Sequence, residues 1–172
     1  MPGLSHGCAP ACASARLGEP AQLVLEPLHL GRAQGAEHGG LVLARLRDQR
    51  RHLLLSSGGD VLHVQCAGGT DTLSLLLVGA STVTGTDISP NMLTVAEEKA
   101  ARLNLDAEWV LADTARLPES LHNRFDLVYT GRGALNWMMD INIWAQNVCV
   151  CVRPGGHLFI FEGHPLDWVW DE

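Results

Sequence analysis

The sequence is poor in aromatic residues, in lysine and in long apolar runs. Aromatic side chains make up 5% of its 172 residues, so aliphatic side chains must form most of any core. No apolar run reaches the ~18 residues that a membrane-spanning helix needs. The N-terminus lacks a basic segment followed by an apolar stretch, so we expect no signal peptide and a cytoplasmic location.

Cysteine usage and charge exclude further classes of protein. The number of cysteines, 5, is odd, and Cys149 and Cys151 are two positions apart, so no disulfide framework is expected. His6, Cys8 and Cys12 lack a fourth partner, and we predict no metal site. The net charge of −7 argues against nucleic acid or an anionic membrane as the main partner.

Apolar residues are plentiful enough for a globular core. They make up 47% of the chain, and the length fits one domain. Residues 1–40 mix short apolar runs with Gly, Ala and Pro, and we expect an irregular or poorly ordered segment there. Residues 41–172 are expected to form the domain, beginning with a helical pattern from Leu41 to Leu55.

After Gly59, strand patterns alternate with helix patterns. Strands are predicted over residues 61–66, 82–87, 107–112, 125–130 and 157–162, and helices over 70–78, over 89–103 and within 135–152. Such alternation predicts an α/β protein whose mainly parallel sheet has helices on both faces. Ligands of such sheets bind beyond the carboxyl ends of the strands, so the loops at those ends are the candidate site.

Three of these loops carry residues suited to a nucleoside-containing ligand. In the loop Cys66–Asp71, Gly68 and Gly69 permit close approach to the backbone, although a tight turn alone is the alternative. Asp87 ends the second strand, where a carboxylate can accept hydrogen bonds from ribose hydroxyls or simply flank the next helix. Asp113 follows the third strand and can receive an adenine amine, unless it is an ordinary loop residue.

Five segments in order resemble one family. They are Val61–Gly69, Thr84–Pro90, Leu111–Thr114, Phe125–Tyr129 and Arg153–His157. Together they resemble the class I S-adenosylmethionine-dependent methyltransferases over about residues 40–165. His-x-Gln-Cys at residues 63–66 and Glu-x-His-Pro at residues 162–165 are similar to a subgroup that acts on small molecules.

The resemblance implies a Rossmann-like three-layer sandwich. Its sheet of about five strands would have the order 3-2-1-4-5. The family's two further antiparallel strands have no counterpart before Glu172, so the chain looks truncated after the fifth strand. The strand 157–162 would then be an exposed edge, through which a second copy of the chain could pair.

The resemblance also implies a site for S-adenosylmethionine. The cofactor-binding residues would be Cys66, Ala67, Gly68, Gly69, Asp87, Ile88, Asp113, Thr114 and Thr130. The turn 67–69 would face the methionyl part, Asp87 the ribose, and Asp113 with the Thr114 backbone the adenine, between Ile88 and Leu117. Thr130 and residues 131–133 would lie near the sulfonium.

The chain departs from the family in its first loop. The family usually carries an acidic residue at the position of His63 and glycines at those of Gln65 and Ala67. These two side chains are expected to narrow the cleft. Because Gln65, Ala67 and Thr70 also break the Gly-x-Gly-x-x-Gly pattern, a nicotinamide-dependent oxidoreductase is disfavoured.

The reaction implied is methyl transfer to an unidentified small-molecule acceptor. A catalytically inactive methyltransferase-like module that binds a protein partner is the alternative. His164 is the candidate general base, with a capping or surface histidine before Pro165 as the alternative, and Asp140 is a weaker candidate. We expect His63 to be buried and hydrogen-bonded rather than catalytic, and Cys66 to be a core residue. Trp137 is either a substrate wall or, as we favour, a buried packing residue.

Overall fold

The computed structural model describes residues 22–27 and 58–162. The strands are β1 (Gln22–Pro27), β2 (Asp60–Val64), β3 (Thr82–Asp87), β4 (Glu108–Leu111), β5 (Phe125–Gly131) and β6 (Val152–Glu162). The helices are α2 (Thr70–Leu77), α3 (Pro90–Leu103) and α4 (Ile141–Cys151), with 3₁₀ turns η4 (Thr114–Arg116), η5 (Glu119–Leu121) and η6 (Leu135–Trp137). Within the described residues, no helix combines the length and apolar character needed to span a membrane.

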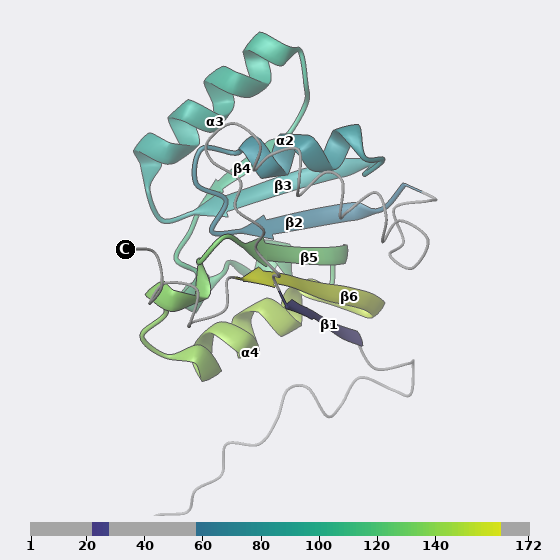
Figure 1. The fold of residues 1–172 in the computed structure, drawn as a ribbon, viewed down its shortest axis with the longest axis vertical. Helices are drawn as coiled ribbons and strands as arrows, with labels where there is room; N and C mark the ends of the chain where they lie inside the picture. The colour runs from purple at the N-terminus through teal and green to yellow at the C-terminus, as the bar shows by residue number, and fades with distance from the viewer. Residues whose placement is uncertain (1–21, 28–57, 163–172) are drawn as a thin grey trace, which may run out of the picture.

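All the strands join one parallel sheet. Its order is β1-β6-β5-β2-β3-β4, as Figure 1 shows. The predicted strands correspond to β2 to β6, so the predicted order 3-2-1-4-5 is confirmed. Because the strands are parallel, the carboxyl ends of β2, β3, β4 and β5 all lie on the same side of the molecule.

One strand was not predicted, and it changes the edge of the sheet. β1 pairs in parallel with β6, in a register from Gln22↔His157 to Pro27↔Glu162. The expectation that residues 157–162 form an exposed edge is therefore wrong, because the backbone of β1 occupies that edge. Pairing of two copies through β6 loses its basis. Pro27, at the end of β1, stands where a strand on the edge of a sheet tolerates proline.

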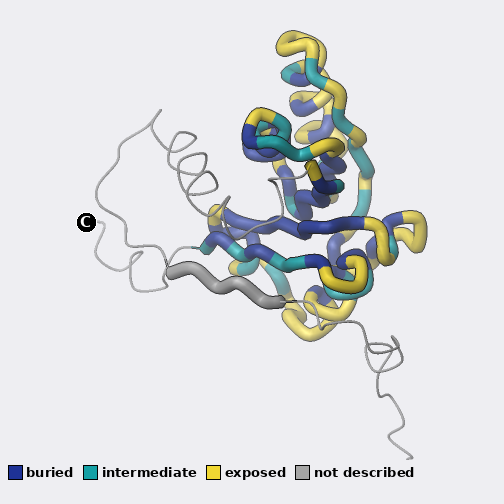
Figure 2. The backbone as a smooth tube through the Cα atoms, turned by 90° about the vertical axis from the view of Figure 1, so that its right-hand side faces the viewer, coloured by how far each residue is buried: buried dark blue, intermediate teal, exposed yellow. Residues whose placement is uncertain are grey.

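Both faces of the sheet are buried, by different helices. Alternate residues of the strands pack against α2 in one cluster, which includes Val61, Leu75 and Tyr129. The residues between them pack against α4 in a second cluster, which includes Leu62 and Trp144. Because successive side chains point to opposite faces and both faces are buried, the strands are continuous apolar runs in the sequence. Figure 2 shows buried residues along the sheet and exposed residues on the outer turns and loops.

The helix starts follow local capping chemistry. Ser89 caps α3 by accepting a hydrogen bond from the Met92 backbone N–H at 3.4 Å, and Pro90 takes the first helical position, as predicted. The helix expected within 135–152 starts at Ile141, because the carboxylate of Asp140 accepts hydrogen bonds from two backbone N–H groups of its first turn.

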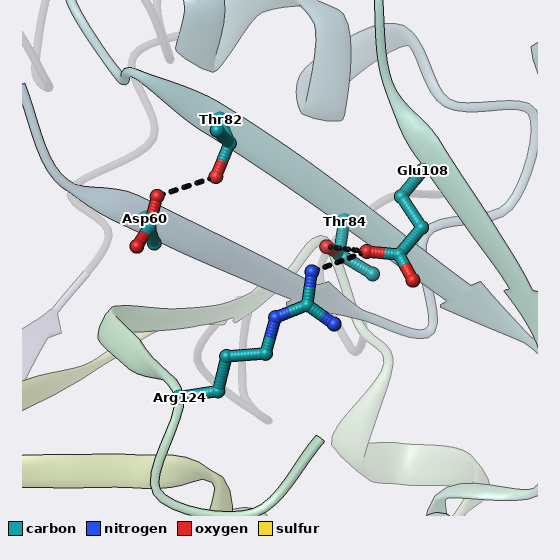
Figure 3. Close-up of polar contacts among 5 residues, drawn as sticks. All are labelled: Asp60, Thr82, Thr84, Glu108 and Arg124. Atoms are coloured by element: carbon teal, nitrogen blue, oxygen red, sulfur yellow. Dashed lines mark hydrogen bonds and ion pairs between the residues drawn. The ribbon is translucent and has the colours of Figure 1, made fainter. Parts of the chain in front are cut away.

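Polar side chains tie the amino ends of three strands together. Asp60 Oδ1 accepts a hydrogen bond from Thr82 Oγ1 at 2.6 Å. Glu108 Oε2 accepts one from Thr84 Oγ1 at 3.0 Å and pairs with Arg124 at 2.6 Å (Figure 3). The hydrogen bond from Arg124 lowers the pKa of Glu108. Because these groups lie at the amino ends, they serve the sheet and leave the opposite ends for a ligand.

Candidate functional site

A cleft of about 530 Å³ opens at the carboxyl ends of the central strands. This volume lies within the range of small-molecule sites. The lining residues come from the ends of β2, β3, β4 and β5 and from the loops that follow them. They are His63, Gln65, Cys66, Ala67, Gly68, Thr70, Asp71, Asp87, Ile88, Asp113, Thr114, Gly131, Arg132, Gly133, Ala134, Trp137 and Met138.

The loop after β2 keeps a glycine-like backbone without the expected glycines. Gln65 has φ 58° and Ala67 has φ 47°, both in the left-handed region that glycine favours. Gly69 has φ 71°, and a Cβ there would lie 2.6 Å from the Cβ of Ala96. Gly69 is therefore required by packing against α3 and does not line the cleft.

The side chain of Gln65 connects three elements. Its Nε2 donates to the Ala134 carbonyl at 2.9 Å, and its Oε1 accepts from Trp144 Nε1 at 3.1 Å. Gln65 thus holds the loop after β5 and the helix α4 against the end of β2. The amide forms part of the cleft wall, and both its polar ends are already satisfied.

Asp87 lies at the end of β3 in a fixed orientation. Its Oδ2 accepts from the Ala67 backbone N–H at 2.8 Å, and its Oδ1 accepts from the Ser89 backbone N–H at 2.9 Å. A carboxylate oxygen accepts more than one hydrogen bond, so both oxygens keep capacity for a ligand. The next side chain, Ile88, is 68% exposed and offers an apolar surface beside them.

The adenine end of the predicted site is also present in the cleft. Asp113 is exposed, and its Oδ1 accepts from the Ala115 backbone N–H at 2.9 Å. Thr114 lines the cleft as predicted. Leu117, expected as a second apolar wall, instead belongs to the buried cluster beneath α4 and does not line the cleft.

Sequence reasoning missed an ion pair at the other end of the cleft. Arg132 Nε lies 2.8 Å from Asp71 Oδ2, joining the loop after β5 to the first turn of α2. Burial raises the pKa of Asp71, against the opposing effects of Arg132 and Lys99. Arg132 has φ 64°, and its backbone N–H donates to the Phe161 carbonyl at 2.7 Å.

Lys99 also belongs to this end, although nothing in the sequence singled it out as a site residue. Its Nζ reaches from α3 to the Gly68 carbonyl at 2.7 Å and to Thr70 Oγ1 at 2.9 Å. The lysine therefore holds the glycine turn against α3 and adds positive charge near the start of α2.

His63 and Cys66 line the cleft but are poorly suited to proton transfer. His63 is buried, and its Nδ1 lies 2.8 Å from Thr72 Oγ1, so the predicted burial and hydrogen bond are confirmed. Burial, reinforced by Arg132, lowers the pKa of His63 to about 3. Burial raises the pKa of the Cys66 thiol to about 12, so Cys66 stays protonated near neutral pH.

The remaining four predicted residues lie in four different settings. Thr130 is fully buried and does not line the cleft. Trp137 is 82% exposed at the cleft, so the packing role that we favoured is wrong. The carboxylate of Asp140 caps α4. His164, the candidate base, lies outside the described residues.

The chain is similar to known proteins. The methyltransferase domain family matches residues 61–156, more than half of the chain. A demethylmenaquinone methyltransferase of Tropheryma whipplei is 29% identical, over 80% of this chain and 58% of its own length. A ubiquinone biosynthesis O-methyltransferase of Methylobacterium nodulans is 30% identical, over 66% of this chain and 44% of its own.

A solved structure of another methyltransferase is also similar to this chain. The S-adenosylmethionine-dependent methyltransferase of Mesorhizobium loti superposes with a TM-score of 0.54 and 29% identity, over 67% of this chain and 52% of its own. The chain thus spans about half the length of these relatives. The family match over the sheet, together with the order of its strands, places the chain in the class I S-adenosylmethionine-dependent methyltransferases.

Proposed function

We propose that the chain binds S-adenosylmethionine in the cleft and transfers its methyl group to a small-molecule acceptor in the cytoplasm. The observation that carries the proposal is the fixed carboxylate of Asp87. Two backbone N–H groups orient it at the end of β3, in the same cleft as the loop after β2 and Asp113. Three strand ends thereby present groups that suit the methionyl, ribose and adenine parts of one molecule.

The residues present fit this cofactor. The oxygens of Asp87 can accept hydrogen bonds from the two ribose hydroxyls, which explains a carboxylate held rigidly at this point. The exposed side chain of Ile88 offers an apolar surface to the adenine ring, and Asp113 offers an acceptor for its amine. The turn from Ala67 to Gly68 faces the same cleft and would hold the methionyl part.

The chain's contribution to the reaction is mainly positioning. S-adenosylmethionine supplies a methyl group on a sulfonium that is already reactive. The protein has to hold an acceptor atom in line with that methyl group and exclude water. Trp137 and Met138 line the same cleft and supply apolar surface for an acceptor. The related quinone methyltransferases make a ring-shaped acceptor one case to test.

His63 and Cys66 line the cleft, but neither is suited to act as the general base. His63 has its pKa lowered to about 3, and the Cys66 thiol has its pKa raised to about 12. We therefore retain His164, which follows β6 in the sequence, as the proposed base for acceptors that lose a proton. An acceptor that reacts without losing a proton would need no such group.

Calorimetric titration with S-adenosylhomocysteine tests the proposal. We expect the wild-type chain to bind it, and Asp87→Ala to raise the dissociation constant at least about tenfold, because hydrogen bonds to a charged group are lost. Asp106→Ala, at an exposed carboxylate outside the cleft, is the matched control and should bind like the wild type. Equal affinity of the Asp87→Ala variant and the wild type would refute the assignment of this site.

A further inference from the structure

An apolar surface continues out of the cleft along the chain after β5. Trp137 and Met138 line the cleft, and Met139 and Ile141 follow them in the sequence. Met139 is fully exposed, Trp137 is 82% exposed and Ile141 is 49% exposed. We call Trp137, Met139 and Ile141 the apolar rim. Exposed apolar side chains that gather beside a cleft are typical of a surface that binds an apolar group.

The backbone turns the apolar rim away from the core. Met138 is extended, with φ −83° and ψ 118°, and it packs against the buried cluster beneath α4. Successive side chains of an extended chain point to opposite sides, so Trp137 and Met139 point away from that cluster. Asp140 is extended as well, and its carboxylate caps α4. The packing of Met138 and the cap at Asp140 therefore hold the rim open beside the cleft.

Polar groups of the neighbouring cleft wall are already hydrogen-bonded. The side-chain amide of Gln65 bonds to the Ala134 carbonyl and to Trp144. The backbone N–H of Trp137 donates to the same Ala134 carbonyl at 3.3 Å. A polar group pressed against these atoms would lose its hydration without gaining new hydrogen bonds, which costs free energy. An apolar group carries no such cost and gains from burial.

Charge and size indicate what kind of molecule covers the rim. Residues 133–152 contain one charged residue, Asp140, and the preceding Arg132 is paired with Asp71. Surfaces that dock on anionic lipid carry clusters of Lys and Arg, so a membrane is disfavoured. A stable protein interface buries about 800 Å² on each partner, which is far more than three side chains supply. A small molecule that extends out of the cleft fits both observations.

We propose that the apolar rim binds an aliphatic chain of the methyl acceptor, so that the acceptors of this protein are lipophilic molecules. The reactive part of the acceptor lies in the cleft against Trp137, and its chain runs over Met139 and Ile141. These side chains then determine specificity by burying apolar area that a polar acceptor lacks. The assignment rests on the proposed function, because it assumes that the acceptor reacts in this cleft.

Two probes that share a ring separate the rim from the rest of the cleft. Resorcinol is a dihydroxybenzene ring, and 4-hexylresorcinol is the same ring with an aliphatic chain. Calorimetric titration of the full chain, saturated with S-adenosylhomocysteine, measures both affinities below the concentration at which the longer probe self-associates. We expect 4-hexylresorcinol to bind at least about tenfold more tightly than resorcinol, because the rim buries part of the chain.

Variants of the rim localise this preference. Met139→Gln and Ile141→Gln each replace an exposed apolar side chain with a polar one and should lower the preference at least about threefold. Trp137→Gln should weaken the binding of both probes, because the ring loses its aromatic partner. Leu103→Gln is the matched control and should keep the wild-type preference, since Leu103 is 60% exposed on α3 and does not line the cleft.

Other occupants of the rim would give different results, each of which overturns the proposal. Co-sedimentation of the wild type, but not of Met139→Gln, with phosphatidylcholine–phosphatidylglycerol vesicles would assign the rim to a membrane. A rise in mass with protein concentration, measured by light scattering and abolished in Met139→Gln, would assign it to a second copy of the chain.

The titrations also distinguish the rim from the proposed function. A lower preference in both rim variants, with the wild-type preference in Leu103→Gln, supports the assignment of the rim. If the wild type binds S-adenosylhomocysteine but shows no preference for 4-hexylresorcinol, or if both folded rim variants keep the preference, only that assignment fails. If the folded wild type does not bind S-adenosylhomocysteine, the proposed function fails and the assignment fails with it.

Discussion

Two side chains in the loop after β2 stand at left-handed backbone positions, and they differ in what they contribute there. Gln65 makes two side-chain hydrogen bonds, to the loop after β5 and to α4. Ala67 has no polar side-chain atoms, and its φ of 47° strains an L-residue. Side-chain hydrogen bonds therefore offset the strained backbone at Gln65, whereas the side chain of Ala67 can make none.

This difference predicts opposite responses to glycine. Ala67→Gly should raise the free energy of unfolding by about 0.5–1 kcal/mol, because it relieves the strain of a left-handed alanine. Gln65→Gly gains the same relief but loses two hydrogen bonds, so it should lower the free energy of unfolding by about 1 kcal/mol. Urea denaturation of the two variants measures both values. An equal gain in stability for both would contradict the bridging role of Gln65.

The buried His63 predicts an acid-dependent loss of stability. The pKa of His63 is lowered from 6.5 to about 3, so between these pH values the unfolded chain carries a proton here that the folded chain lacks. The free energy of unfolding therefore falls as pH falls, by about 1.4 kcal/mol per pH unit from this residue. Replacing the histidine should remove that contribution.

Urea denaturation at pH 6.5 and about pH 5 tests this expectation. His63→Asn should have a lower free energy of unfolding at both pH values but a smaller loss between them, by about 2 kcal/mol. His122→Asn, at a partly exposed histidine, keeps His63 and should retain the wild-type loss. The same loss in His63→Asn and the wild type would show that His63 is not the titrating group.

At the scale of elements, the features that depend on residues close together in the sequence could be predicted from it. Ser89 and Pro90 predicted the start of α3, and the apolar runs predicted β2 to β6. The strand Gln22–Pro27 was not predicted, because it ends in a proline and its partner β6 lies near the other end of the sequence. For the same reason the pairing of Asp71 with Arg132 could not be predicted: each lies in a loop or helix start, and only the fold brings them together.

Asp140, a weaker candidate base in the sequence analysis, caps a helix in the structure. Its Oδ1 accepts hydrogen bonds from Asn142 and Ile143 at 2.9 and 3.1 Å, which caps α4. Asp140→Ala should therefore lower the free energy of unfolding by about 1 kcal/mol, as measured by denaturation, and leave the affinity for S-adenosylhomocysteine unchanged. Lower affinity with unchanged stability would instead favour a role in the site.

At the scale of the whole molecule, one continuous sheet joins segments from distant parts of the chain. β1 pairs with β6 and takes the outermost position on that side of the sheet, and apolar clusters cover both faces. The outermost strand is then the six-residue β1, which ends in Pro27, instead of the eleven-residue β6, and a short strand with a proline is a poorer template for pairing between copies of the chain. The sheet also fixes the cleft, because the residues that line it lie at the strand ends or in the loops and helix starts that follow them.

The edge strand predicts the state of association. Leu25→Pro removes a backbone donor within β1, opposite Ile160 of β6, and should weaken this pairing. We expect the variant to self-associate through the uncovered β6, which size-exclusion chromatography with light scattering would detect as a larger mass. Leu23→Val keeps the donor and is the control. An unchanged mass for a folded Leu25→Pro would mean that β1 is not what protects the edge.

We propose that a single cofactor lies across the ends of β2, β3 and β4, and a crystal structure of the chain with S-adenosylhomocysteine would show whether it does. We expect both ribose hydroxyls within hydrogen-bond distance of Asp87, the adenine beside Ile88 and Asp113, and the methionyl part beside the turn from Ala67 to Gly68. A nucleoside bound with its ribose away from Asp87, or at another surface of the protein, would contradict it.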